Sequence, residues 1–209
     1  MIMPRRILSM ADFAAISPCE YADGLGREQF VDFAIKGLWP AMPRIAGPAF
    51  TVKCAPGDHL SLHAAIYEAS AGDVIVVEAD PQYAVAGGNV CAIAQQRGIA
   101  GFVVDGVIRD LAQVRDIQFP VFARGVIPKP GAKTHIFPFN QGITCGGAKV
   151  NAGDIIVADE EGIAVIPMTQ LAEVYAIAKA RTDKDAAMDL EQWGREHQQK
   201  VASLVLKLR

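Results

Sequence analysis

Apolar and polar positions alternate along this chain in short blocks that predict a mixed α/β domain. Runs of β-branched and other apolar residues predict strands at Ala49–Lys53, Val74–Val77, Gly101–Val104, Pro120–Ala123, Gly153–Val157 and Ile163–Pro167. Apolar residues at helical spacing predict helices at Ser9–Ala15, Leu60–Ser70, Val90–Arg97 and Ile108–Ile117. Asp105-Gly106 is typical of a turn, and Arg124–Gly131 is a loop rich in glycine and proline. We therefore expect one α/β domain spanning residues 1–209.

The C-terminal segment has a different pattern. From Thr169 to Arg209 the sequence contains almost no turn signal except Gly194. Apolar residues at helical spacing predict two amphipathic helices, marked by Leu171, Val174, Ile177 and Ala178 and then by Val201, Leu204, Val205 and Leu208. Because a long helical tail on a small domain packs more often on a neighbour than it stands free in water, we expect residues 168–209 to lie at an oligomer interface.

Composition narrows the class of protein. The 209 residues are 51% hydrophobic, which is enough for one well-packed domain. A net charge of −3 with scattered Lys and Arg argues against nucleic-acid binding. No apolar run approaches the roughly 18 residues that a membrane span needs. The N-terminus lacks the pattern of a secretory signal, and the four cysteines are dispersed. We expect a cytoplasmic protein without membrane or nucleic-acid partners.

The segment Gly87-Gly88-Asn89-Val90 is the first candidate for chemistry. Glycines just before a helix leave the backbone N–H groups unobstructed, and these groups, with the helix dipole, attract a carboxylate or phosphate. The alternative is that the two glycines only make a tight turn.

The second candidate is Arg109-Asp110, which follows a predicted strand. Ligands of α/β folds gather at the carboxyl ends of strands. Arginine offers a planar fork for a carboxylate or enolate oxygen, and aspartate is a hard ligand suited to Mg²⁺ or Mn²⁺. The pair could equally be a helix cap with a surface salt bridge.

Other polar groups give weaker signals. His59 and His63 have a spacing that can bind zinc, but no third ligand is evident. Asp159-Glu160-Glu161 is typical of a solvated turn. Cys91 has no histidine near it in sequence and is assigned to packing. No lysine lies in a segment that clearly suggests a Schiff base, so a metal route is favoured over an imine route.

Five segments together resemble the RraA-like family in order and spacing, from about Gly47 to Pro167: PGDHLSLHAAI, AGDVIVVEAD, GGNVCAIAQQRGIAGFVVDGVIRD, FPVFARGVIP and AGDIIVADEEGIAVIP. That family includes class II 4-hydroxy-4-methyl-2-oxoglutarate and 4-carboxy-4-hydroxy-2-oxoadipate aldolases, oxaloacetate decarboxylases, and regulators of ribonuclease E activity.

The resemblance implies a role for each matching position. Gly87, Gly88, Asn89 and Val90 match the segment whose amides hold a pyruvyl carboxylate. Arg109 matches the arginine that contacts the carbonyl or enolate oxygen. Asp110 matches the direct ligand of a divalent metal, Mg²⁺ or Mn²⁺, whose shell is completed by water. Asp185 falls where an acidic residue of a neighbouring subunit holds metal-bound water.

Two positions depart from the aldolase pattern. Many of the aldolases have Asp where this chain has Gly88. A variant pattern has Gly there and then requires Glu or Asp three positions after the metal-binding aspartate, where this chain has Gln113. A glutamine can hydrogen-bond a metal-bound water but adds no charge, so a weaker metal site is expected.

The resemblance implies a three-layer β/β/α sandwich of the swivelling-domain type, with a helical C-terminal segment, assembled as homotrimers or a homohexamer. It implies a metal-dependent carbon–carbon lyase for small 2-oxo acids that works through a pyruvate enolate, by retro-aldol cleavage, oxaloacetate decarboxylation or both. The alternative is a non-catalytic regulator that binds a protein partner. The presence of Arg109-Asp110 favours the enzyme, whereas the uncharged Gln113 leaves the regulator as an alternative.

Overall fold

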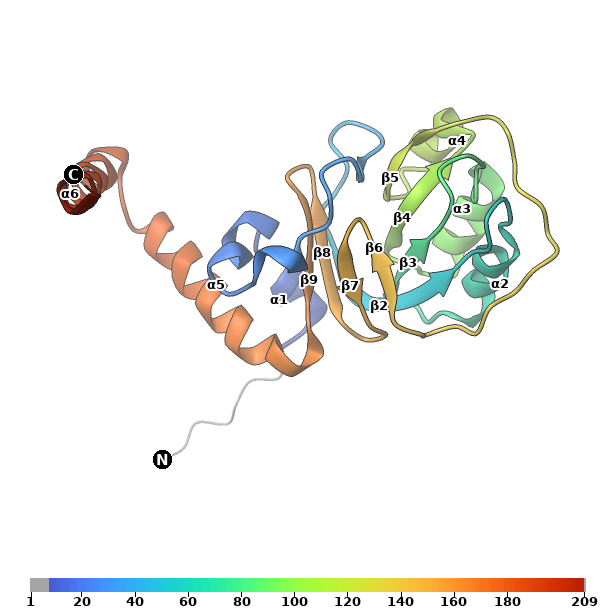
Figure 1. The fold of residues 1–209 in the computed structure, drawn as a ribbon, viewed down its shortest axis with the longest axis horizontal. Helices are drawn as coiled ribbons and strands as arrows, with labels where there is room; N and C mark the ends of the chain where they lie inside the picture. Colours follow the sequence, from blue (N-terminus) through green and yellow to red (C-terminus); the bar gives the residue numbers. More distant parts are fainter. Residues whose placement is uncertain (1–7, 209) are drawn as a thin grey trace.

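Residues 8–208 of a computed structural model are described here, and they form two β-layers with helices on both outer sides (Figure 1). The first half contains α1 (Met10–Ala14), η1 (Pro18–Asp23), η2 (Arg27–Gln29), β1 (Lys36–Gly37), β2 (Ile45–Lys53), α2 (Leu60–Glu68), β3 (Val74–Glu78) and α3 (Gly88–Gln96). The second half contains β4 (Gly101–Ile108), α4 (Leu111–Asp116), β5 (Val121–Val126), β6 (Ile143–Cys145), β7 (Ala148–Val150), β8 (Ile155–Asp159), β9 (Gly162–Ile166), η3 (Met168–Gln170), α5 (Leu171–Ala186) and α6 (Leu190–Leu208).

Strand β2 joins the two β-layers. Its first part, Ile45–Pro48, pairs antiparallel with β8, and its second part, Ala49–Lys53, pairs parallel with β3. The resulting strand order is β1-β5-β4-β3-β2-β8-β9. Gly47 lies at the change of partner, where a Cβ atom would collide with the carbonyl oxygen of Gly72. A glycine is therefore needed for the backbones to approach each other at this bend.

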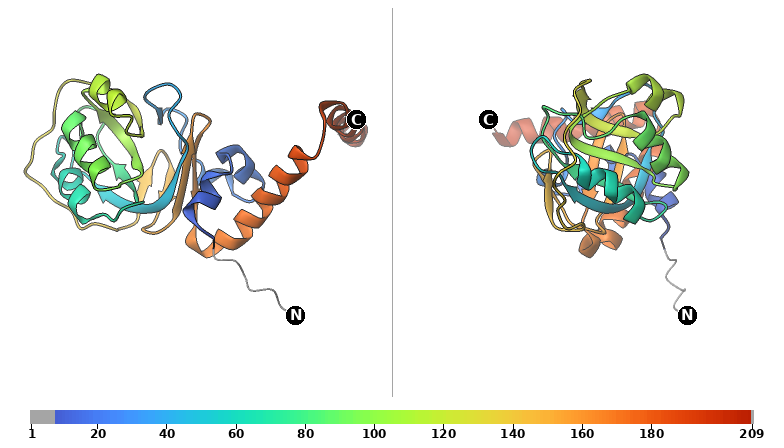
Figure 2. Two further views of the ribbon diagram at one scale, coloured as in Figure 1. Left: turned by 180° about the vertical axis from the view of Figure 1, so that it is seen from behind. Right: turned by 90° about the vertical axis from the view of Figure 1, so that its right-hand side faces the viewer.

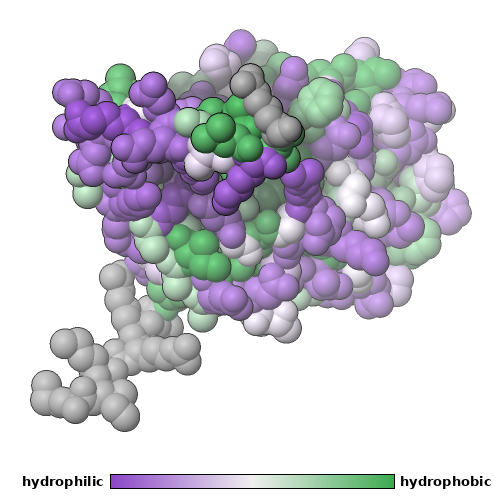
Figure 3. All heavy atoms as spheres, turned by 60° about the vertical axis from the view of Figure 1, so that its left-hand side comes forward, coloured by the Kyte–Doolittle hydropathy of each residue, from purple (hydrophilic) through white to green (hydrophobic). Residues whose placement is uncertain are grey.

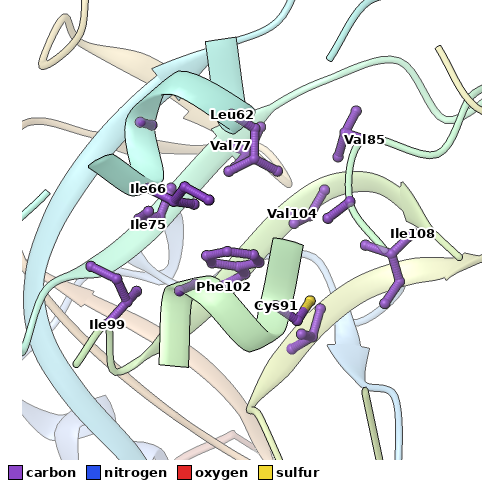
Figure 4. Packing of buried hydrophobic residues seen from close by; sticks show 14 of the residues in the cluster. Leu62, Ile66, Ile75, Val77, Val85, Cys91, Ile99, Phe102, Val104 and Ile108 are labelled. Atoms are coloured by element: carbon purple, nitrogen blue, oxygen red, sulfur yellow. The ribbon is translucent and has the colours of Figure 1, made fainter. Parts of the chain in front are cut away.

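Helices α2, α3 and α4 cover the outer face of the parallel strands β2–β5. Between them lies a core in which the Phe102 ring packs among side chains of α2, α3 and β3 (Figure 4). Phe102 also meets Phe119 edge to face, with ring centroids 4.9 Å apart. Strands buried on both faces need apolar residues at successive positions, which explains the continuous runs at Val74–Val77 and Gly101–Val104.

Two further cores complete the layers. One lies between the β-layers and contains Val76, Val103, Ile156 and Val165. The other lies on the far side of β8 and β9, where α1, η1 and α5 pack, and is centred on Tyr21, whose hydroxyl donates to the carbonyl of Phe13 at 3.0 Å. This arrangement confirms the expected β/β/α sandwich with a helical C-terminal segment.

Helix α6 projects from the rest of the chain (Figures 1 and 2). None of its described residues is buried, and Leu190, Leu206 and Leu208 are more than three-quarters exposed. On the side of the molecule that carries α5 and α6, hydrophobic side chains reach the surface (Figure 3). Within residues 8–208, no helix combines the length and apolarity that crossing a membrane requires.

The prediction of a turn at Asp105-Gly106 was wrong. Strand β4 continues through both residues to Ile108, with a shift of register against β5 between Val104 and Val107, and α4 begins only at Leu111. The turn-forming aspartate is accommodated because its carboxylate accepts hydrogen bonds from Arg124 Nε at 2.5 Å and from the Gly146 amide at 2.7 Å. Strand β5 likewise extends into the expected loop, and the hairpin β6–β7 was not predicted.

Candidate active site

A cavity of about 480 Å³ opens beyond the carboxyl ends of β3 and β4. This is where ligands of open α/β sheets bind. Its walls come from the start of α2, the segment before α3, the end of β4 and the segment after β5. The lining residues are His59, His63, Ala84, Val85, Ala86, Gly87, Asn89, Val90, Arg109, Asp110, Pro130, Gly131 and Lys133.

The segment before α3 runs beside the end of β4. The Val85 amide donates to the carbonyl of Val107 at 3.0 Å, and the Arg109 amide donates to the carbonyl of Ala86 at 2.9 Å. A Cβ atom at Gly87 would lie 2.5 Å from Asp110 Oδ2 and 3.1 Å from Arg109 Cγ. Close packing against Arg109 and Asp110 therefore requires a glycine at position 87. The alternative interpretation, in which the glycines only make a tight turn, does not account for this contact.

Asp110 joins the two candidate motifs. Its backbone has φ 59° and ψ 38°, a left-handed conformation that aspartate tolerates better than most residues. Its Oδ2 accepts a hydrogen bond from the Gly88 amide at 3.2 Å and lies 3.5 Å from Arg109 Nε. The Arg109 and Asp110 side chains are 43% and 42% exposed, so both can reach a ligand in the cavity.

The first turn of α3 closes this wall of the cavity. The first four N–H groups of a helix have no partner within it, and the helix dipole makes this end attractive to anions. Asn89 and Val90 lie in this turn and line the cavity, whereas Gly88 is buried and its amide is already bonded to Asp110. The structure thus brings Gly87, Asn89, Val90, Arg109 and Asp110 to one cavity, with Gly88 behind them.

Gln113 lies over Gly88. A Cβ atom at position 88 would collide with the Gln113 Oε1 atom, so the two positions share one volume of space. A side chain at 88 therefore cannot be added unless the present Gln113 side chain moves.

Asp185 does not lie at the cavity of its own chain. It is on α5, with its Oδ2 3.7 Å from Arg181 Nε. Arg181 also pairs with Glu20 and Asp23 on η1. That Asp185 serves a neighbouring subunit stays a prediction.

A second wall of the cavity was not assigned a role from the sequence. His59, the N-cap residue of α2, and His63 on the first turn of α2 stack with ring centroids 4.3 Å apart and an interplanar angle of 16°. His59 is 6% exposed, and within the described chain neither of its ring nitrogens has a hydrogen-bond partner. Burial, with the charge of Lys133, lowers the pKa of His59. Burial, with His59 and Lys133, lowers the pKa of His63 to about 4.

Lys133 reaches this wall because the segment around it is tied to the start of α2. The buried Asp58 carboxylate accepts hydrogen bonds from the amides of Leu60, Thr134 and His135, and the Ala132 amide donates to the carbonyl of Gly57 at 2.7 Å. The sequence showed the His59/His63 spacing and a Gly/Pro-rich loop. It did not show that Asp58 would bring the two together.

The donor set of the cavity fits a hard divalent cation held largely by water. Among residues 8–208 there is no group of three His, Cys, Asp or Glu side chains that could hold a metal ion, so a zinc site of protein ligands alone is not formed. The half-exposed carboxylate of Asp110 reaches the cavity beside the start of α3. Mg²⁺ is commonly bound by only one or two carboxylates and keeps several waters.

Comparison with known proteins gives consistent matches. Residues 18–165 match the RraA-like family, described as Aldolase/RraA. A protein of Halalkalibacterium halodurans named "Putative 4-hydroxy-4-methyl-2-oxoglutarate aldolase" is 45% identical over 148 residues, which is 70% of each chain. A protein of Burkholderia multivorans with the same name is 35% identical over 124 residues, 58% of this chain and 75% of that one.

The fold is shared with solved structures. The crystal structure of Streptomyces coelicolor RraAS2, described as an unusual member of the RNase ES inhibitor RraA protein family, aligns with a TM-score of 0.71 and 26% identity and covers 91% of this chain and 96% of that one. An uncharacterised protein from Pseudomonas syringae aligns with a TM-score of 0.76 at 24% identity, over 89% and 90% of the two chains.

Proposed function

The chain belongs to the RraA-like family, and from that premise we propose that it is a divalent metal-dependent lyase that cleaves a carbon–carbon bond in small 2-oxo acids. The observation that carries the proposal is the meeting of Arg109, Asp110 and the start of α3 in one cavity. The aldolase names of the relatives support this class of reaction.

Each wall group has a task that follows from its chemistry. The free amides at the start of α3 would bind the carboxylate of the 2-oxo acid, as helix N-termini bind anions. The Arg109 guanidinium, held beside Asp110, would donate to the keto oxygen and stabilise the negative charge that develops there as the enolate forms. Gly87 would keep the backbone close enough for both contacts.

Asp110 would hold the cation, Mg²⁺ or Mn²⁺, and Gln113 could hydrogen-bond one of its waters. The bound cation would supply Lewis-acid polarisation of the oxo acid. Because Gln113 carries no charge, Asp110 would provide the main electrostatic attraction from this chain.

The same site serves two reactions. With a 4-hydroxy-2-oxo acid the departing half is a second oxo acid, and with oxaloacetate it is carbon dioxide. In both, the electron pair of the broken bond passes into the enolate of pyruvate. We propose that the protein acts on substrates of the 4-hydroxy-4-methyl-2-oxoglutarate type, on oxaloacetate, or on both.

The test measures pyruvate release from both substrates in the presence of Mg²⁺ and after EDTA. Arg109→Ala is expected to lower both rates by about 10²–10³-fold, because one preorganised donor to the developing charge is lost. Arg115→Ala, on the exposed side of α4, is the matched control and should retain the wild-type rates. Near-normal turnover of Arg109→Ala, in protein that unfolds at the wild-type temperature, would remove the assignment.

A non-catalytic regulator is the second candidate. It is favoured by the uncharged Gln113 and by the description of the Streptomyces coelicolor relative as an RNase ES inhibitor family member. If the pure protein leaves oxaloacetate decomposing at the background rate, with and without EDTA, the regulator replaces the lyase.

A further inference from the structure

The histidine wall of the cavity has no task in the scheme above, yet it lines the same cavity as the groups that would bind the oxo acid. The pair His59 and His63 projects from α2, and Lys133 comes from the segment after β5. Burial and the charge of Lys133 lower the pKa of both rings, and His59 also lowers that of His63, so the neutral form of each imidazole is favoured at pH 7. A neutral imidazole can accept a proton.

Retro-aldol cleavage requires such a group, because the 4-hydroxyl proton must leave as the C3–C4 bond breaks. In residues 8–208, the titratable side chains that line the cavity are His59, His63, Lys133, Arg109 and Asp110. Arg109 cannot be deprotonated. Asp110 is engaged by the Gly88 amide and assigned to the cation. The nearby Cys91 is buried, and burial raises the pKa of its thiol to about 12.

Of the two histidines, His63 is better placed to touch substrate. It is only partly buried, whereas both nitrogens of His59 are shielded from solvent and unpartnered within the described chain. The near-parallel stack favours the present tilt of the His63 ring, since tilting it would lose contact with the His59 ring. His59 is therefore suited to positioning, and His63 to proton transfer.

We propose that His63 is the general base of the aldol cleavage and that His59 is the residue that positions it. This rests on the proposed function above. The imidazole takes the proton of the 4-hydroxyl, and the oxygen electron pair forms the new C4 carbonyl. The C3–C4 pair passes into the enolate, whose C3 then takes the proton back from the imidazolium to give pyruvate. No oxidant or co-reactant is needed, and His63 ends in its starting state.

The charges around His63 set its working range. Lys133 and Arg109 face it from two other segments of the chain, and His59 faces it from the N-cap of α2. In the free protein the positive charges of Lys133 and Arg109 disfavour the imidazolium. A bound oxo acid brings negative charge against the same cations, so it is expected to raise the pKa of His63 toward the range in which a base works at neutral pH.

Oxaloacetate decarboxylation gives an internal reference, because it breaks no O–H bond and therefore needs no base for cleavage. The experiment compares His63→Gln with wild type on both substrates. Aldol cleavage should fall by about 10²–10⁴-fold, the usual contribution of a general base, whereas decarboxylation should fall by far less. His135→Gln, a histidine outside the cavity with a 68% exposed side chain, is the matched control and should keep the wild-type ratio of the two rates.

The outcomes separate the two proposals. If wild type catalyses neither reaction, the proposed function fails. If wild type catalyses both and His63→Gln slows them equally, or slows neither, only the assignment of the base is overturned. Oxalate affinity and unfolding temperature of His63→Gln are also measured. Wild-type values of both exclude misfolding as the cause of a selective loss of aldol cleavage.

A second measurement is independent of turnover. The His63 imidazole signal, assigned by its absence in His63→Gln, is titrated by NMR in the free protein and with Mg²⁺ and oxalate. Its pKa should rise by about one unit on binding, and an unchanged value overturns the proposal. His59→Ala should lower aldol cleavage and shift its pH profile, whereas His59→Phe, which keeps the stack, should restore most of the rate. Equal losses in both variants would refute positioning by stacking.

Discussion

At the scale of single residues, Asp110 has a strained backbone that is retained at the proposed site. A left-handed conformation at a residue other than glycine costs on the order of 1–3 kcal/mol and persists where the surroundings enforce it. Here the Gly88 amide and Arg109 hold the carboxylate at the start of α3. The strain thus has a structural consequence, because it directs a carboxylate to the end of a helix that also attracts anions.

Gln113 packs over Gly88, whose amide is bonded to Asp110, so the charge at position 113 is expected to affect cation affinity. In Gln113→Glu a second carboxylate would lie beside Asp110 without a change of size. One added negative charge at about 4 Å from a divalent cation in a watery site is worth about 2 kcal/mol, so Mg²⁺ or Mn²⁺ should bind roughly 30 times more tightly. Calorimetric titration of the metal measures this. Gln96→Glu, at the far end of α3, should leave the affinity unchanged, and an equal gain in both variants would place the cation elsewhere.

These residues also show what a sequence can reveal about a site. Gly87, Arg109 and Asp110 could be predicted because each lies at a junction of strand and helix, where a local pattern implies a position in space. His63 and Lys133 are 70 residues apart, and their meeting depends on the hydrogen bonds of Asp58. The packing of Gln113 over Gly88 could not be predicted from the sequence, because the two residues lie on different helices.

At the scale of elements, the start of α2 and the segment 132–135 depend on one another through Asp58. Burial alone raises the pKa of Asp58, but hydrogen bonds from Leu60, Thr134 and His135 lower it by more, and the net pKa lies below its usual range. A carboxyl whose folded pKa is depressed stabilises the fold above its unfolded pKa of about 3.9. That contribution is lost as the pH falls through the folded pKa.

Asp58→Ala is therefore expected to lower the free energy of unfolding by about 1.5–3 kcal/mol near pH 7, the range for hydrogen bonds to a charged group. The difference from wild type should shrink as the pH falls below about 4, because the Asp58 carboxyl of the unfolded chain then binds protons while that of the folded chain stays ionised, which favours unfolding. Denaturant unfolding at a series of pH values measures this. Asp116→Ala, on the exposed side of α4, is the control, and a loss for Asp58→Ala that did not vary with pH would contradict the ionic origin.

Elements with continuous apolar runs were predicted well, and elements with mixed signals were not. The strands at Val74–Val77 and Ile163–Ile166 follow directly from burial on both faces. The Asp105-Gly106 pair has the composition of a turn, and only the distant Arg124 and Gly146 make it tolerable in a strand. The hairpin β6–β7 escaped prediction because each strand has only three residues.

At the scale of the whole molecule, α6 stands out because none of its described residues is buried by the rest of the chain. Its apolar residues Val201, Leu204, Val205 and Leu208 recur at the spacing of one helix face, and all of them are at least 41% exposed. Fully burying such a side chain contributes about 1.5–3 kcal/mol. Together they favour association, and we propose that residues 168–209 form the oligomer interface of a homotrimer or homohexamer.

The last prediction tests that interface together with the site. Val201→Glu and Leu204→Glu, made together, would place two charges on the apolar face of α6, so the protein is expected to sediment as a monomer. If the neighbouring subunit completes the site, as Asp185 would require, lyase activity is lost with the oligomer. Gln198→Glu and Gln199→Glu, made together, add the same charge to polar positions of α6 and should change neither property. Full specific activity in a demonstrated monomer would show that the cavity of one chain suffices, and Asp185 would then have no part in it.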